Sequence, residues 1–311
     1  MTDWTPDRIG DLTGRRAFVT GATSGIGRFV ALELVRHGAE VVVGARDSEK
    51  ARELRRWLES EVQGARTGVV PLDLGSLSSV RAGAEWARTE WDGFDLLVNN
   101  AGIMAAPRRR SPEGFELHLA TNHLAHFTLT ALLWPRLAAR DGRVVTVSSL
   151  FHTLVDRIDL AALTPLGSSR RYVRYRAYAE SKLANLVFAL ELDRRLRDSR
   201  SRATSMAAHP GYASTGLFKG GPSIGARGPW SLAVQQVSRV VGQPAALGAW
   251  PVLMAATAPG LASGSYVGPS GQGGLRGTPQ LVGWSSTAGD PRLGRDLWEA
   301  SERAAGLTFR P

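Results

Sequence analysis

Short runs of apolar, mostly β-branched residues recur along the chain and alternate with longer helical patterns. The runs show no apolar–polar alternation, which is typical of strands covered on both faces of a sheet. Strands are expected at 17–20, 41–43, 69–72, 96–98, 144–147, 203–209 and 265–267. Helices are expected at about 25–37, 48–60, 76–91, 113–139, 178–196, 244–258 and 290–305. Repeated strand–helix units of this length predict an α/β fold, a doubly wound parallel sheet of about seven strands with helices on both faces.

The pattern changes after Gly211, but no linker separates a second folded unit. Residues 216–229 are rich in Gly, Pro and Ser, and 230–241 are periodically apolar. We therefore expect one domain over 1–311, with a substrate lid at 212–243 and a C-terminal extension at 271–311. Whether 230–241 form a lid, a subunit contact or a membrane-surface helix stays open.

Composition narrows the cellular setting. The chain has no cysteine, which excludes disulfides, cysteine-ligated metals and thiol nucleophiles and fits a reducing compartment. No apolar stretch approaches the roughly 20 residues that span a bilayer, and the first 14 residues lack the apolar core of a signal peptide. We expect a cytoplasmic protein without an integral membrane segment.

The formal charge of +10 comes almost entirely from arginine, since only three of the 38 basic residues are lysine. We interpret this as a solvated basic surface, including the runs at 108–110 and 170–176. The alternative is attraction of anionic ligands such as a phosphorylated cofactor. No zinc pattern, RNA-binding aromatic signature or groove-binding basic helix is present, so nucleic acid is not an expected partner. His118, His123 and His126 lack a carboxylate at ligand spacing, which favours packing or hydrogen bonding over metal binding.

A glycine-rich turn lies where the first strand should end and the first helix begin. Residues 20–27 read Thr-Gly-Ala-Thr-Ser-Gly-Ile-Gly. Gly21, Gly25 and Gly27 allow a tight turn and a close backbone approach to a pyrophosphate, and the helix start adds unpaired N–H groups. With Ser24 and Ile26 between the glycines, this turn predicts dinucleotide binding in a Rossmann-type fold.

The second strand indicates which dinucleotide is preferred. An acid at its end would bind the adenosine ribose, whereas an arginine accommodates a 2′-phosphate. The position expected for the acid holds Ala45, and Arg46 follows it. Asp47 lies one residue too far along and is expected to begin the next helix. The sequence therefore predicts NADP(H) rather than NAD(H).

Tyr178 and Lys182 are four residues apart, which places the phenol and the ammonium on one face of a helix. A free tyrosine has a pKa near ~10, too high for proton exchange at neutral pH. A nearby lysine and an oxidised nicotinamide both favour the phenolate. A decrease of about 3 pKa units, or roughly 4 kcal/mol, would suit general acid–base catalysis.

Several motifs occur together and in order over nearly the whole chain. They are the turn at 20–27, Asn-Asn-Ala-Gly at 99–102, Ser-Ser at 148–149, Tyr-Ala-Glu-Ser-Lys at 178–182 and Pro-Gly at 210–211. This combination resembles the short-chain dehydrogenase/reductase family. The segments at 99–104, 121–127 and 181–192 and the long interval between Ser149 and Tyr178 resemble its retinol-dehydrogenase-like branch.

The resemblance implies roles for individual residues. Tyr178 matches the catalytic acid–base, Lys182 the residue that lowers its pKa and holds the nicotinamide ribose, and Ser149 the hydrogen-bond donor to the substrate oxygen. Asn122 matches a residue that holds a water in the proton relay, and Ser148 is expected to be structural. Further cofactor contacts are implied for Asp73, Leu74, Asn100, Ala101, Gly102, Pro210, Gly211 and Thr215.

These expectations combine into an NADP(H)-dependent enzyme that reduces a carbonyl compound or oxidises the corresponding alcohol by hydride transfer. A lipophilic substrate is favoured because Met104, Phe151, Tyr212, Leu217, Phe218 and Trp230 could line the pocket. The alternatives are a tailoring ketoreductase of natural-product biosynthesis and a non-catalytic, NADP(H)-binding regulatory protein. The resemblance also implies a homodimer or a homotetramer without choosing between them.

Overall fold

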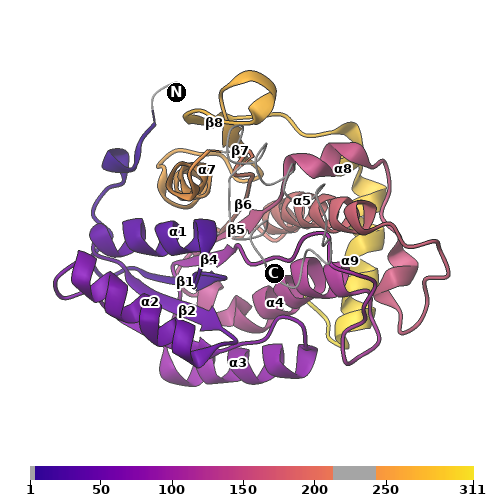
Figure 1. Ribbon diagram of the computed structural model, residues 1–311, viewed down its shortest axis with the longest axis horizontal. Helices are drawn as coiled ribbons and strands as arrows, with labels where there is room; N and C mark the ends of the chain where they lie inside the picture. The colour runs from indigo at the N-terminus through magenta and orange to yellow at the C-terminus, as the bar shows by residue number, and fades with distance from the viewer. Residues whose placement is uncertain (1–3, 213–242) are drawn as a thin grey trace, which may run out of the picture.

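The computed structural model describes residues 4–212 and 243–311, and eight strands there form one sheet (Figure 1). The strands are β1 (Arg16–Thr20), β2 (Glu40–Ala45), β3 (Thr67–Pro71), β4 (Leu96–Asn99), β5 (Arg143–Val147), β6 (Thr204–Ala208), β7 (Tyr266–Pro269) and β8 (Pro279–Leu281). Their order is β3-β2-β1-β4-β5-β6-β7-β8. All neighbours pair in parallel except β7 and β8, which are antiparallel. The predicted single-domain, doubly wound α/β fold is therefore confirmed.

Helices cover both faces of the sheet, as Figure 1 shows. Helices α1 (Gly25–Arg36), α2 (Ser48–Glu61) and α7 (Ala245–Thr257) pack on one face. The other face is covered by α3 (Leu77–Glu90), α4 (Ala125–Ala138) and α5 (Arg174–Asp198). Helix α9 (Pro291–Ala305) packs on α5, and the short α8 (Ser286–Gly289) precedes α9. Among the described helices, none is both long and apolar enough to cross a bilayer.

Strand β1 shows why the apolar runs lack polar alternation. Ala17 and Val19 belong to the core beneath α1 and α7, whereas Phe18 belongs to the core beneath α3 and α4. All three side chains are completely buried. Because both faces of the strand are covered, every position favours an apolar residue.

The structure differs from the sequence-based expectation in one additional strand and in the starting points of two helices. The sheet has an eighth strand, β8, which is only three residues long and begins with Pro279, so it gives no apolar run. The helix expected at 113–139 begins only at Leu117, because Gly114 has a φ of +92° and Arg110 bridges to Glu116. Two residues later it passes through the π-helical segment η2 (Leu119–Leu124), after which α4 follows. Helix α5 begins at Arg174, so Tyr178 lies in its second turn rather than opening it.

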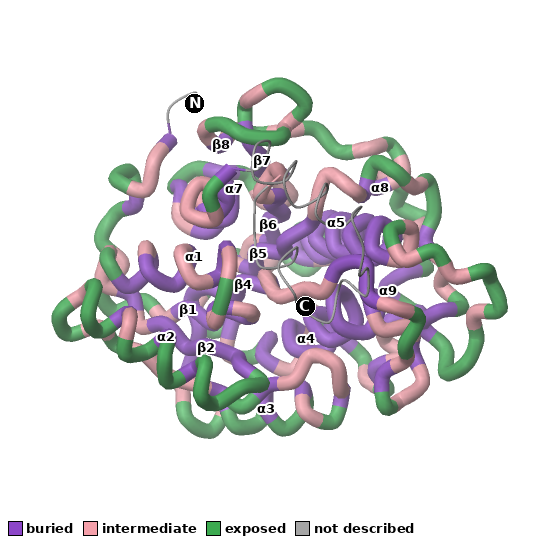
Figure 2. The backbone as a smooth tube through the Cα atoms, viewed as in Figure 1, coloured by how far each residue is buried: buried purple, intermediate pink, exposed green. Residues whose placement is uncertain are grey.

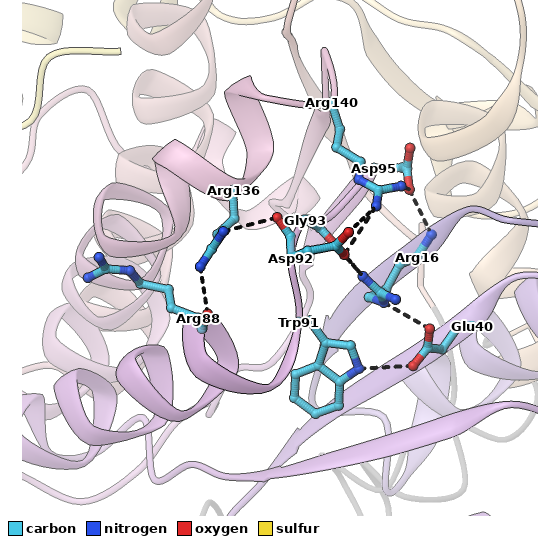
Figure 3. Close-up of polar contacts among 9 residues, drawn as sticks. All are labelled: Arg16, Glu40, Arg88, Trp91, Asp92, Gly93, Asp95, Arg136 and Arg140. Carbon is cyan, nitrogen blue, oxygen red and sulfur yellow. Dashed lines mark hydrogen bonds and ion pairs between the residues drawn. The ribbon is translucent and has the colours of Figure 1, made fainter.

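Charged side chains tie together the amino-terminal ends of the central strands (Figure 3). The Arg16 guanidinium bonds Glu40 at 2.8 Å and Asp92 at 2.7 Å. Asp95, which is 7 % exposed, accepts the Arg16 backbone N–H at 2.8 Å. Arg140 also reaches Asp92 at 3.1 Å. This network fixes the relative positions of β1, β2 and β4 at the end of the sheet opposite to their carboxyl ends.

Helix α9 closes the outer side of α5 with an aromatic cluster. The Trp298 ring stacks on Phe309 at 4.9 Å and meets Phe127 edge-on at 5.1 Å. It also contacts Phe188 of α5 at 5.9 Å. Residues 178–193 of α5 are consequently buried on all sides, and Figure 2 shows that helix as a buried tube. The helix that carries Tyr178 is thus held by the sheet on one side and by α9 on the other.

We predict that Trp298→Ala lowers the free energy of unfolding by about 3–5 kcal/mol, because it leaves a cavity among three aromatic rings. Urea denaturation followed by circular dichroism measures this. Trp86→Ala is the control, since Trp86 is 53 % exposed on α3 and its loss should change stability by less than about 0.5 kcal/mol. Equal losses in the two variants would contradict the packing argument.

Acid should destabilise the fold through buried histidines. Burial lowers the pKa of His123 to about 3 and that of His126 to about 4, against an ordinary value near 6.5. Below pH 6.5 the unfolded chain therefore binds protons that the folded chain does not, and stability falls as the pH decreases towards 4. His123→Gln keeps a hydrogen-bonding group for Ser301 but removes the titration. The pH dependence of its unfolding free energy should be shallower than that of the wild type, and an unchanged slope would argue against this origin.

Candidate active site

The candidate site lies at the carboxyl ends of β1, β4 and β5. The sheet order reverses at β1, since the chain runs outward from β1 to β3 and then returns to the other side with β4. Crossover helices leave in opposite directions there, which opens a crevice where doubly wound sheets bind their ligands. A pocket occupies this position. It is lined by Gly21, Ser24, Gly25, Ile26, Gly27, Asn100, Ala101, Gly102, Val147, Ser148, Tyr178, Lys182 and Pro210.

The glycine turn is packed tightly against the loop that follows β4. Gly21 has a φ of +68°, and a Cβ on it would lie 2.8 Å from the Cα of Ala101. A Cβ on Gly27 would lie 2.5 Å from both Asn100 Nδ2 and the Gly21 carbonyl oxygen. Asn100 Nδ2 donates to the Thr20 carbonyl at 2.8 Å, which holds the two loops together. Neither position has room for a side chain.

This cradle fits the pyrophosphate of a dinucleotide. Ser24 precedes α1 in an extended conformation, and its side chain does not cap the helix. The Ser24 hydroxyl therefore does not accept hydrogen bonds from the first N–H groups of α1, which lie at the positive end of the helix dipole. Bare glycine backbone together with an uncapped helix start is the arrangement that anionic phosphates prefer.

Tyr178 and Lys182 line the pocket, and Ser149 lies beside Tyr178. Lys182 Nζ donates to the Val147 carbonyl at 3.1 Å and lies 5.9 Å from the centre of the Tyr178 ring. Ser149 begins the short helix η3 (Leu150–Leu154), and its side chain hydrogen-bonds Tyr178. The neighbouring Ser148 Oγ donates to the Lys182 carbonyl at 2.7 Å, so it joins β5 to α5.

Burial dominates the electrostatics of these groups. It raises the pKa of Tyr178 to about 12, although the hydrogen bond with Ser149 acts in the opposite direction. Burial lowers the pKa of Lys182 to about 8. The sequence led us to expect a lowered Tyr178 pKa, but in the protein by itself this pKa is raised. Lys182 does not compensate for the loss of hydration that burial causes.

Asn122 lies in the π-helical turn η2, next to Gly102 and Lys182. A Cβ built on Gly102 would be 3.3 Å from both Asn122 Oδ1 and Lys182 Nζ. Asn122 Oδ1 accepts the Ile103 N–H at 2.8 Å, and Nδ2 donates to the Ile103 carbonyl at 3.0 Å and to Ser181 Oγ at 2.9 Å. The side chain thus connects the loop after β4 to α5.

The other expected cofactor residues that the structure describes are not among those that line this pocket, and they follow the carboxyl ends of β2, β3 and β6. Arg46 is exposed directly after β2, and Asp47 caps α2 as predicted by accepting two backbone N–H groups. Asp73 follows β3, where its side chain accepts the Gly75 N–H at 2.9 Å, and Leu74 packs against the core. Gly211 follows the wall residue Pro210 with a φ of +67°. Thr215 and most of the expected lid at 212–243 lie outside the described residues.

Thr20 and His126 are site residues that the sequence reasoning missed. Thr20 Oγ1 accepts the N–H groups of Asn100 and Ala101, both at 3.0 Å. The same oxygen lies 3.0 Å from His126 Nε2, and His126 Nδ1 bonds the Asn122 carbonyl at 2.8 Å. Thr20 begins the glycine-rich motif and His126 was expected to pack or form hydrogen bonds, but neither was expected to join the loops of the site.

An apolar group surrounds the Tyr178 ring on its other side. Met104, Ala105 and Tyr178 form one buried cluster, and Phe151 packs against it. The Phe151 ring meets Tyr178 edge-on at 5.4 Å and stacks on Tyr175 at 6.4 Å. Of the expected pocket residues, Leu217, Phe218 and Trp230 lie outside the described residues.

Comparison with known proteins places the chain in a family. The sequence profile of the short chain dehydrogenases matches residues 15–157. A polyprenol dehydrogenase of Mus musculus is 38 % identical over 98 % of this chain and 88 % of its own length. Retinol dehydrogenase 13 of Homo sapiens is 35 % identical over 95 % of this chain and 86 % of its own length.

A solved structure extends this similarity to the whole fold. The crystal structure of an uncharacterized protein from Mycobacterium Paratuberculosis has 39 % identity and a TM-score of 0.80, and the match covers 99 % of both chains. In this chain the glycine turn, the Asn-Asn-Ala-Gly loop, the serine pair and the Tyr-Lys helix thus lie on a fold that this solved structure shares. The chain belongs to the short-chain dehydrogenase/reductase family of oxidoreductases and, within it, to the retinol-dehydrogenase-like branch.

Proposed function

We propose that the protein is an NADP(H)-dependent oxidoreductase that reduces a carbonyl group of a lipophilic small molecule, or oxidises the corresponding alcohol, with Tyr178 as the acid–base. The observation that carries this proposal is that Tyr178 and Lys182 line the glycine-rich pocket together, and that the Ser149 side chain hydrogen-bonds Tyr178 beside it. A phenol, a hydroxyl and a cation around one point are suited to a carbonyl oxygen that gains charge.

The backbone of Gly21 and of 24–27 would hold the pyrophosphate, and 100–102 with Pro210 would line the rest of the dinucleotide. When bound, the reduced nicotinamide supplies the hydride that adds to the carbonyl carbon. Ser149 donates a hydrogen bond to the substrate oxygen, and Tyr178 donates its proton to that oxygen as charge develops. Since burial keeps Tyr178 protonated well above neutral pH, the acid is available for reduction. In the oxidising direction the Tyr178 phenolate accepts the proton of the alcohol, and the positive charge of Lys182 stabilises the phenolate.

Arg46 supports the choice of NADP(H). Its side chain is free to extend into solvent at the carboxyl end of β2, while the preceding Ala45 is buried and offers no carboxylate. The nearest acid, Asp47, is engaged by the N–H groups of Glu49 and Lys50 at 3.0 and 3.2 Å. A guanidinium without a competing carboxylate suits a 2′-phosphate.

Met104 and Phe151 support a lipophilic substrate. Together with Ala105 they surround the Tyr178 ring with apolar atoms. A polar substrate would lose hydration against this wall without gaining a hydrogen bond, which disfavours it. The names of the relatives, polyprenol and retinol dehydrogenases, point to the same class of substrate.

Tyr178→Phe should lower kcat by about 10²–10⁴-fold, because it removes the proton donor and leaves the ring in place. The measurement is NADPH oxidation, followed by absorbance, against a panel of aldehydes, ketones and quinones. NADPH binding, followed by fluorescence, should stay within twofold of the wild type. Full activity in the variant would exclude Tyr178 as the acid, and NADPH binding without any turnover would favour a non-catalytic protein.

Arg46→Ser should raise the Michaelis constant for NADPH by about tenfold or more, the loss expected for one charge-assisted hydrogen bond. The constant for NADH should stay nearly unchanged. Arg52→Ser is the matched control, because Arg52 is an exposed arginine on α2 that pairs with Glu49. A wild-type preference for NADH, or equal effects of both variants, would contradict the assignment.

A further inference from the structure

The loop that carries Met104 has an unusual backbone. Ala105 has a φ of +51°, in the left-handed region that side chains other than glycine rarely adopt. Ala105 is also only 2 % exposed, so it does not lie in a surface turn. Such a residue persists only where its surroundings hold it.

Two side chains from elsewhere in the chain hold the next residue. The His118 Nε2 atom accepts the Ala106 N–H at 3.1 Å, and the Tyr172 hydroxyl donates to the Ala106 carbonyl at 2.7 Å. Both polar groups of one peptide residue are thus bound by side chains. We call His118 and Tyr172 the Ala106 clamp.

A hydrogen bond with Glu116 fixes the orientation of the His118 ring. His118 is completely buried, and its Nδ1 lies 2.9 Å from Glu116 Oε1. Because Nε2 accepts the Ala106 N–H, Nδ1 must carry the ring proton and donate it to Glu116. Glu116 Oε2 in turn accepts the Leu119 N–H at 2.8 Å, which anchors it at the start of η2.

The clamp also reaches the catalytic phenol. The His118 ring lies edge-on to Tyr178, with centroids 6.5 Å apart, and Met104 belongs to the same buried cluster as Tyr178. On the other side of Met104, Ile103 is fixed by two hydrogen bonds to Asn122. Met104 and Ala105 therefore span a short distance between two fixed points.

We propose that His118 and Tyr172 are positioning residues that hold Ala105 in the left-handed region, set Met104 as a wall against Tyr178, and thereby determine how tightly a small carbonyl substrate is bound. This inference rests on the proposed function. A substrate with a short chain depends on the Met104 wall, since it has few other contacts. A substrate with a long chain gains contacts farther away and depends on the wall less.

Tyr172→Phe tests the clamp by removing a single hydroxyl. It should raise the KM for butanal about fivefold, the effect of one neutral hydrogen bond, and change kcat and NADPH binding less than twofold. The KM for decanal should change less than twofold, so the selectivity shifts towards decanal. Tyr175→Phe is the matched control, since it removes the hydroxyl of a half-exposed tyrosine three residues away that stacks on Phe151.

A second readout follows the wall itself and needs no turnover. The chain has four methionines, Met1, Met104, Met206 and Met254, so ¹³C-methyl labelling gives a simple NMR spectrum that Met104→Leu assigns. The Met104 signal should move in Tyr172→Phe and stay in place in Tyr175→Phe. His118→Gln, which keeps an acceptor for the Ala106 N–H, should move it less than His118→Ala.

The two readouts separate the ways in which the idea could fail. A Met104 signal that does not move in Tyr172→Phe, or one that moves without any change in selectivity, overturns the clamp while the oxidoreductase function stands. Absence of turnover of both aldehydes and of a wider carbonyl panel by the wild type overturns the proposed function, and the specificity role of the clamp falls with it.

Discussion

The close approach of two loops, after β1 and after β4, is the constraint on which the site depends. Asn100 holds the Thr20 carbonyl, and the contact leaves no room for a Cβ on Gly21 or Gly27. The same contact directs the start of α1 into the pocket and brings 100–102 beside Lys182. Any side chain at Gly27 would separate the loops and displace both the phosphate cradle and the wall opposite to it.

Buried polar side chains extend this constraint through the layer of helices. Thr20 receives two N–H groups from the β4 loop and contacts His126, which bonds the Asn122 carbonyl. Asn122 then reaches Ser181, whose hydroxyl bonds the Tyr178 carbonyl at 2.7 Å. Because buried polar groups are costly without partners, each member of this chain fixes its neighbours. The result is a continuous connection from the glycine turn to the helix that carries Tyr178.

The fold was largely predictable because its signals are local. Seven of the strands lie at the apolar runs, and Asp47 caps α2 where the sequence indicated. The errors occurred where local pattern and tertiary contact disagree. A helix was expected from residue 113, yet the positive φ of Gly114 and the bridge from Arg110 to Glu116 delay its start to Leu117. β8 is only three residues long and begins with Pro279, so it gives no apolar run from which a strand could be predicted.

The sequence by itself determined the order of chemical groups: a glycine turn after one strand, a serine pair after another, and Tyr178 and Lys182 on one helical face. The positions of these groups depend only on their spacing within a strand, a turn or a helix, and that spacing can be read from the chain. Only the tertiary structure decided how those groups are held, because His118, Tyr172 and Ala106 are far apart in sequence and meet through hydrogen bonds between separate segments. Burial likewise shifted the pKa values of Tyr178 and Lys182, since the loss of hydration depends on every atom packed around them and not only on the residues next to them in the sequence.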